Sequence, residues 1–210
     1  MTVAASVFVI DDDLSVRKSL TRLIEAAGYT VTAFASAREF LRAQPAPGPC
    51  CLVLDVRMPG LTGLEVQEAL AGSEHRMAIV FITGHGDISM SVKAMKGGAV
   101  DFLTKPFEIE TLLEAVKRAL TKDVKALGEE SRTAEVLDRV KLLTPRETEV
   151  FALVVTGMLN KQIAADMQIT EKTVKVHRAR VMHKMQAKSL AELVRLADRA
   201  AVIVPKVAAP

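Results

Sequence analysis

Five short apolar runs alternate with stretches of helical spacing in the first half of the chain, and this alternation limits the fold more than any other feature. Each run has four or five residues, which suits a buried strand and is too short for a helix. Strands separated by helices pair in parallel, and helices then cover both faces of the sheet. The pattern predicts an α/β domain with a doubly wound five-stranded parallel sheet, its strands at 7–10, 30–34, 51–54, 79–82 and 99–103.

The pattern changes beyond residue 120. Residues 121–141 are charged and keep apolar residues roughly on a heptad, which predicts a helical linker with Gly128 as a candidate interruption. Thr144 and Pro145 supply an N-cap and a first-turn proline, and the chain from there is purely helical. We therefore expect an α/β domain at 1–120 and an all-α domain at 142–204, with a frayed tail after them.

Charge is unevenly distributed. Residues 141–210 contain 12 Lys and Arg against 6 Asp and Glu, whereas residues 1–120 contain 12 against 14. A basic surplus confined to one end indicates a nucleic-acid partner there. The sequence shows neither a bilayer-length apolar stretch nor a signal peptide, so we expect a cytoplasmic protein without a membrane partner. Cys50 and Cys51 are adjacent and would point to opposite faces of a strand, which favours two buried thiols over a disulfide.

Polar side chains stand at the carboxyl ends of the predicted strands, where doubly wound sheets bind ligands. Asp11 and Asp12 follow the first strand, Asp55 the third, Thr83 the fourth and Lys105 the fifth. Three converging carboxylates would repel one another unless a hard divalent cation or protons compensated their charge, and an oxygen-rich site with open positions suits Mg²⁺. A carboxylate can also attack phosphorus, with the metal and Lys105 neutralising the phosphoryl charge and Thr83 donating a hydrogen bond. Each residue alone is explained by a solvated loop, but five together indicate a site.

The motifs at 9–13, 54–60, 82–85 and 105–106 resemble the receiver domain of response regulators over about residues 1–120. The resemblance implies a flavodoxin-like, CheY-like sheet of order 2-1-3-4-5 and a phosphoacceptor at Asp55. It also implies Mg²⁺ or Mn²⁺ bound by Asp12, Asp55 and the backbone carbonyl of Arg57, with Asp11 acting directly or through water.

By the same resemblance, Lys105 contacts the phosphoryl group and precedes a cis proline. Thr83 and Phe102 would form a switch in which the hydroxyl moves toward the phosphoryl group and the ring turns inward. Strand alternation sets Phe102 on the face opposite to its neighbours, and an ordinary core residue is the alternative reading. For His85, between two glycines, a loop residue is favoured over a metal ligand or a base.

The segments 142–150, 160–164 and 173–178, with Gly157 between the first two, resemble the four-helix DNA-binding domain of NarL/FixJ-type (LuxR-type) regulators, most closely the FixJ-like ones. The recognition helix would be 171–185. Its inward side is formed by Val174, Val181 and Met185, with His177 at the margin. Its opposite, DNA-facing side comprises Lys172, Lys175, Val176, Ala179, Arg180 and His183.

Within this surface, Lys175 and Val176 are the predicted base contacts, and Thr173 belongs to the same motif. Phosphate contacts are predicted for Lys161, Arg178 and Lys184, with a solvated basic face as the alternative for each. Some relatives have lysine where Ala179 stands, so their base preference does not transfer. The last helix, from Ser189 to about Ala200, places Leu190, Leu193, Val194 and Ala197 on one face, which serves either the core or a dimer seam.

These features predict a two-component response regulator. A sensor histidine kinase would phosphorylate Asp55, and this would control homodimerisation, binding to paired DNA half-sites and transcription, with RNA polymerase as a further partner. The chain would not be a dedicated enzyme, apart from removing its own phosphoryl group. A phosphohydrolase using Asp55 is one alternative, but Arg57 stands two residues later, where such enzymes often need a second aspartate as the acid. A constitutive DNA-binding protein is another, and the intact acidic set argues against it.

Overall fold

The computed structural model describes residues 5–43, 48–71, 77–84 and 88–200. The chain divides into two compact units, Met1–Gly128 and Glu129–Pro210, and this division falls within the predicted linker. The domain limits at 120 and 141 stay predictions, and the predicted tail lies outside the described residues. None of the helices in the described ranges combines the length and apolarity that a membrane span needs.

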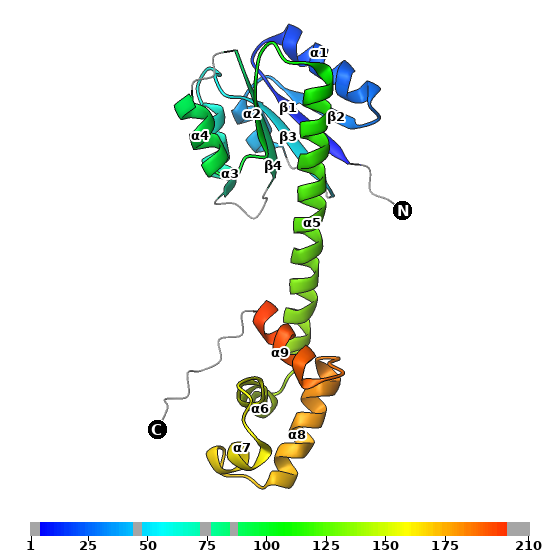
Figure 1. The fold of residues 1–210 in the computed structure, drawn as a ribbon, viewed down its shortest axis with the longest axis vertical. Helices are drawn as coiled ribbons and strands as arrows, with labels where there is room; N and C mark the ends of the chain where they lie inside the picture. The colour runs from blue at the N-terminus through cyan, green and yellow to red at the C-terminus, as the bar shows by residue number, and fades with distance from the viewer. Residues whose placement is uncertain (1–4, 44–47, 72–76, 85–87, 201–210) are drawn as a thin grey trace. The chain divides into compact units, whose positions relative to one another are not determined.

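Unit 1 is built on a parallel sheet in the order β2-β1-β3-β4-β5 (Figure 1), which confirms the predicted fold and strand order. Asp55 and Thr83 are the last residues of their strands and do not follow them. The fifth strand begins two residues later than predicted, because the Ala99 amide still donates to the Ala94 carbonyl at the end of the preceding helix. The strands are β1 (Ser6–Ile10), β2 (Thr30–Phe34), β3 (Cys50–Asp55), β4 (Ala78–Thr83) and β5 (Asp101–Thr104).

Helices cover both faces of the sheet (Figure 1). In β1, Val7 and Val9 pack with α1 and α5, whereas Phe8 and Ile10 pack with α2, α3 and α4, as strand alternation requires. The helices are α1 (Leu14–Ala26), α2 (Ala37–Arg42), α3 (Gly63–Ala71), α4 (Ile88–Lys96) and α5 (Ile109–Lys141).

The two cysteines are buried free thiols, as predicted. Cys51 belongs to the core on the α1 and α5 side of the sheet and Cys50 to the core on the other side. Burial raises the pKa of Cys50 to about 12, and the neighbouring Asp123 carboxylate adds to this shift. Both thiols are therefore protonated at neutral pH and suit a packing role.

Helix α5 continues through Gly128, the candidate interruption, without a break. A glycine inside a helix costs only about 1 kcal/mol relative to alanine, and the flanking Ala, Leu, Lys and Glu are strong helix formers. The helical character predicted for 121–141 is confirmed. The helix that was predicted to begin near Phe107 begins at Ile109.

Unit 2 contains the end of α5 followed by α6 (Pro145–Val155), α7 (Asn160–Asp166), α8 (Glu171–Lys184) and α9 (Leu190–Arg199). This confirms the predicted four-helix arrangement. Thr144 caps α6 in a reciprocal capping box with Glu147, and Gly157, at a φ of 87°, follows the end of the helix. Val136 of α5 is buried in the same core as α6, α7, α8 and α9.

Candidate functional site

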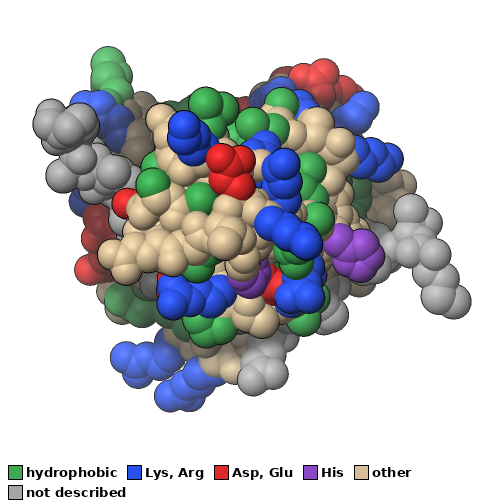
Figure 2. Space-filling model, turned by 90° about the horizontal axis from the view of Figure 1, so that it is seen from below, with side chains coloured by type: hydrophobic (Ala, Val, Ile, Leu, Met, Phe, Trp, Pro, Cys, Tyr) green, Lys and Arg blue, Asp and Glu red, His purple; other side chains and the backbone are tan. Residues whose placement is uncertain are grey.

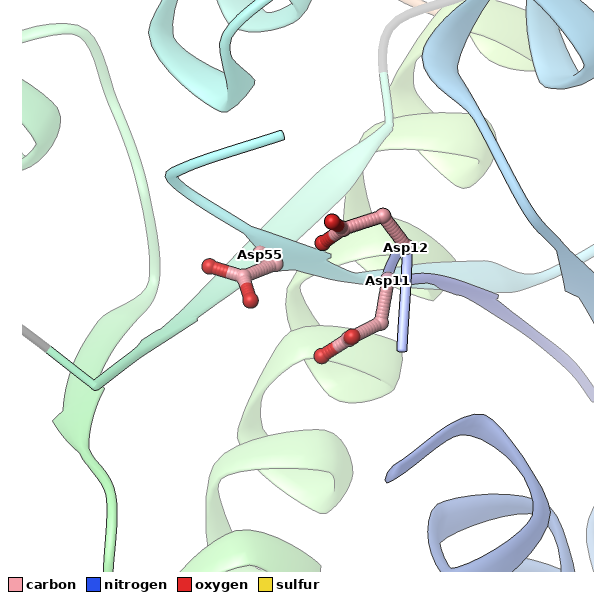
Figure 3. Close-up of side chains that lie close together, drawn as sticks. All are labelled: Asp11, Asp12 and Asp55. Carbon is pink, nitrogen blue, oxygen red and sulfur yellow. The ribbon is translucent and has the colours of Figure 1, made fainter. Parts of the chain in front are cut away.

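The carboxyl ends of β1 and β3 bring three aspartates together (Figure 3). Asp11 directly follows β1, Asp12 is next to it, and Asp55 ends the adjacent β3. One carboxylate oxygen from each lies within 4.8 Å of the others. Asp11 and Asp55 are buried, while Asp12 is exposed to solvent. The convergence predicted from strand order is therefore present.

Lys105 bridges two of these carboxylates. Its Nζ donates to Asp11 Oδ2 at 2.6 Å and to Asp55 Oδ2 at 3.0 Å. Burial alone would lower the pKa of Lys105, but these two hydrogen bonds raise it, so the ammonium stays charged. Burial raises the pKa of Asp11 despite the opposing effect of Lys105. One lysine thus leaves the negative charge of three aspartates incompletely compensated.

The donor set fits a hard divalent cation. Carboxylate oxygens are the ligands that Mg²⁺ prefers, and it also keeps waters, which the exposed side at Asp12 would admit. Arg57, the other predicted contributor, is exposed, and its backbone amide donates to Asp55 Oδ1 at 3.1 Å. The use of the Arg57 carbonyl as a metal ligand stays a prediction.

The predicted switch residues lie on the neighbouring strands. Thr83 ends β4 and is fully buried. Phe102 of β5 is half-buried, with its ring centroid 6.2 Å from that of Phe81, on the sheet face opposite to Leu103. The predicted alternation is confirmed, whereas movement of the two side chains stays a prediction. The cis peptide at Lys105–Pro106 is present, and His85 lies outside the described residues.

Two positioning residues were missed by the sequence reasoning. Arg17 of α1 donates through Nη1 to the Asp11 carbonyl at 2.7 Å. Gly63, the first residue of α3, donates its amide to the Val56 carbonyl at 2.9 Å, and a Cβ added there would lie 2.5 Å from the Asp55 carbonyl oxygen. Both contacts span six or seven residues across the turn from a strand to the following helix, and no periodicity or capping pattern in the sequence marks them.

The second candidate surface is on α8. Val174, Val181 and Met185 are fully buried, as predicted. The opposite side is exposed at every position that was predicted to face DNA: Lys172, Lys175, Val176, Ala179, Arg180 and His183. Figure 2 shows the side of unit 2 on which α7 and the start of α8 lie, and Lys and Arg side chains gather on that side. Thr173 is half-buried and shares a hydrogen bond with Thr170, the N-cap of α8.

The predicted phosphate contacts differ in their surroundings. Lys161 is exposed. Arg178 is half-buried and donates to Asn160 of α7. Lys184 donates to the buried Glu147 carboxylate at 2.6 Å and to the Leu142 carbonyl at 3.0 Å. The ammonium group of Lys184 therefore links the end of α8 to the start of α6 through hydrogen bonds. The contact of Lys184 with a DNA phosphate stays a prediction.

Glu147→Gln is expected to weaken the acid sensitivity of unit 2. The hydrogen bond from Lys184, and after it the hydrogen bond from the Thr144 amide, lower the pKa of Glu147 to about 2, from an ordinary value of 4.5. A carboxyl group whose pKa is lowered by folding stabilises the fold fully when the pH is above its ordinary pKa of 4.5. This stabilisation is lost as the pH falls from 4.5 toward 2. Protection of the α6 amides against hydrogen exchange, measured in the full chain between these limits, should fall less steeply in the variant.

Lys184→Met is the matched variant, because it removes the other partner of the same hydrogen bond. It should weaken the pH dependence in the same direction but less than Glu147→Gln does, because the Thr144 amide still donates to the Glu147 carboxylate. Protection that falls in Glu147→Gln as steeply as in the wild type would contradict the role of the pair.

Two family models match the chain. Residues 7–117 match the response regulator receiver domain, and residues 141–197 match the luxR family of bacterial regulatory proteins. The two matches cover the two candidate surfaces separately, the acidic group in the first and α8 in the second.

The chain is similar to full-length relatives. It is 50% identical over 194 residues to nodulation protein W of Bradyrhizobium diazoefficiens, covering 92% of this chain and 86% of that protein. It is 44% identical over 203 residues to the transcriptional regulatory protein FixJ of the same species, covering 97% and 99%. Both alignments therefore include the receiver and luxR-family segments together.

Solved structures of response regulators are similar to this chain over nearly its whole length. The response regulator StyR superposes with a TM-score of 0.81 at 44% identity, covering 94% of this chain and all of that one. Full-length FixJ from B. japonicum superposes with a TM-score of 0.57 at 43% identity, covering 97% and 100%. The likeness thus extends over both units of the chain.

Proposed function

Because the chain belongs to the response regulator family, with a receiver domain and a luxR-family DNA-binding domain, we propose that a sensor histidine kinase transfers a phosphoryl group to Asp55. Members that combine a receiver with a luxR-family domain are phosphorylation-dependent transcription regulators and not dedicated enzymes. A kinase and DNA are accordingly their partners.

The bridge from Lys105 to Asp11 and Asp55 is the observation that carries it. In the transfer, an Asp55 carboxylate oxygen forms a bond to phosphorus, the phosphorus–nitrogen bond of the kinase phosphohistidine breaks, and the imidazole leaves with the bonding electron pair and takes up a proton. The positive charge of the Lys105 ammonium would lie beside the phosphoryl oxygens and stabilise their negative charge, and Thr83 would donate a hydrogen bond to one of them. Slow hydrolysis of the acyl phosphate in the same pocket would end the signal.

Asp11, Asp12 and Asp55 would hold Mg²⁺ or Mn²⁺, with the Arg57 carbonyl as a further ligand. When bound, the metal supplies positive charge that stabilises the phosphoryl oxygens. The close approach of the three carboxylates supports this assignment, as does the burial that raises the pKa of Asp11.

We assign dimerisation to the receiver and DNA contact to α8. Ile88, Val92 and Met95 lie three or four residues apart on α4 and are exposed, which supports an apolar seam between two receivers. Two chains would place two α8 helices on paired half-sites.

We also propose contact with RNA polymerase, because the family regulates transcription. DNA and a kinase-borne phosphoryl group meet in the cytoplasm, which supports that location.

The test is to incubate the full chain with Mg²⁺ and a small-molecule phosphodonor. Intact mass, molar mass by light scattering and retention of DNA are followed together. We expect the mass of one phosphoryl group to be added, the dimer fraction to rise and DNA retention to increase. Modification without any change in DNA retention would contradict the proposed coupling, and absence of modification would contradict the receiver assignment.

Lys175→Ala is expected to reduce discrimination between DNA sequences. A base contact contributes about 1–3 kcal/mol of discrimination, so the ratio of affinities for a selected duplex and a random duplex should fall by about 5-fold to 150-fold. Lys161→Ala is the matched control, because a phosphate contact contributes equally to both duplexes. Equal losses of discrimination in the two variants would refute the assignment of Lys175.

A further inference from the structure

One hydrogen bond joins the two helices of the helix-turn-helix through their polar side chains. Arg178 Nη1 on α8 donates to Asn160 Oδ1 at 3.0 Å, and Asn160 is the first residue of α7. Both side chains are half-buried. The bond therefore lies at the surface of the unit, where the guanidinium can meet a ligand as well as its partner.

The position of Arg178 around α8 suggests what that ligand is. At 100° per residue, Arg178 lies about 60° from Lys175 and a similar angle from the buried Val181. It thus occupies the flank between the exposed side and the core side of the helix. When the exposed side of a helix enters the major groove, its flank faces the phosphates that border the groove.

The chemistry of the pair fits a phosphate. A guanidinium has five N–H donors in a planar fork, and the bond to Asn160 uses one of them. The carboxamide is a neutral acceptor, so it fixes the plane of the fork without cancelling its charge. A carboxylate at the same place would hold the fork as well but would neutralise it and repel a phosphate.

We propose that Asn160 is a positioning residue that holds the Arg178 guanidinium against a DNA phosphate, so that the two residues act as one phosphate-binding unit. This inference rests on the proposed binding of DNA by α8. It adds a residue from α7 to the DNA-binding surface, and that residue acts only through Arg178.

The test measures the affinity of the full chain for a fluorescent DNA duplex of random sequence at several salt concentrations. Arg178→Ala should make the negative slope of log affinity against log salt shallower by about 0.9, the value for one lost phosphate contact. Asn160→Ala should weaken binding about fivefold and should also make the slope shallower. Asn160 is uncharged, so a change in the salt slope of Asn160→Ala reports on the phosphate contact of Arg178 and not on a phosphate contact made by Asn160.

Two further variants separate this role from a purely structural one. In the Arg178→Ala background, Asn160→Ala should cause no additional loss. Asn160→Asp should keep the thermal unfolding midpoint, because a carboxylate also accepts from Arg178, and yet bind DNA more weakly than Asn160→Ala. An additive double variant, an unchanged slope in Asn160→Ala, or wild-type binding by Asn160→Asp would overturn the proposal. A wild-type chain that binds no duplex would instead contradict the proposed function.

Discussion

Asp55→Asn is expected to abolish phosphorylation of the chain and the increase in DNA retention that follows it. The amide that replaces the carboxylate is nearly the same size but is not a nucleophile toward phosphorus. It can still accept a hydrogen bond from Lys105, which remains paired with Asp11. The variant should therefore fold like the wild type and differ in its chemistry. Intact mass after incubation with Mg²⁺ and a small-molecule phosphodonor measures the loss.

Glu25→Gln is the matched control, because it makes the same acid-to-amide change on the exposed surface of α1. It should gain one phosphoryl group, as the wild type does. If Asp55→Asn were phosphorylated to the same extent as Glu25→Gln, the acceptor would be another residue and the assignment of the site would be wrong.

Gly63→Ala is expected to damage the same site through the backbone. The added Cβ would lie 2.5 Å from the Asp55 carbonyl oxygen and 3.0 Å from Val56 Cα. Since both are backbone atoms, no side-chain rotation relieves the overlap, and the end of β3 must move. Overpacking of this kind costs about 1–3 kcal/mol of unfolding free energy. Urea unfolding should show that loss, and the rate of phosphorylation should fall because Asp55 moves away from Lys105 and Asp11.

Gly84→Ala is the control for Gly63→Ala. Gly84 directly follows Thr83 at the same edge of the sheet, and a Cβ there would meet no atom within 4 Å. Its stability and its phosphorylation should stay close to those of the wild type. Equal stability of the two alanine variants would show that the contact between α3 and β3 tolerates a methyl group.

Local sequence signals were sufficient for most of the fold. The order of short apolar runs predicted a parallel sheet because the alternation of strands and helices allows few other arrangements. The capping residues Thr144 and Glu147 marked the start of α6, since they bond to backbone groups within the same turn. Errors occurred at ends of elements, such as Ala99, where hydrogen bonds to the preceding helix compete with strand pairing.

The candidate sites were only partly predictable. Asp55 and its polar neighbours could be found because the carboxyl ends of parallel strands share one edge of the sheet. Lys184 is different, because nothing near it in sequence indicates that Glu147 accepts its hydrogen bond. Asn160 belonged to a recognised motif, but its link to Arg178 depends on how closely α7 packs against α8.

By itself, the sequence determined the number and order of the elements, the carboxyl-end position of Asp55 and the exposed side of α8. These features can be read from the local periodicity of apolar residues and from the order of the elements along the chain. Only the tertiary structure decided that Lys105 bridges Asp11 and Asp55, and that Gly63 packs directly against the Asp55 backbone. Such contacts join residues on separate elements, and their distances are set by the packing of the whole core and not by any local preference.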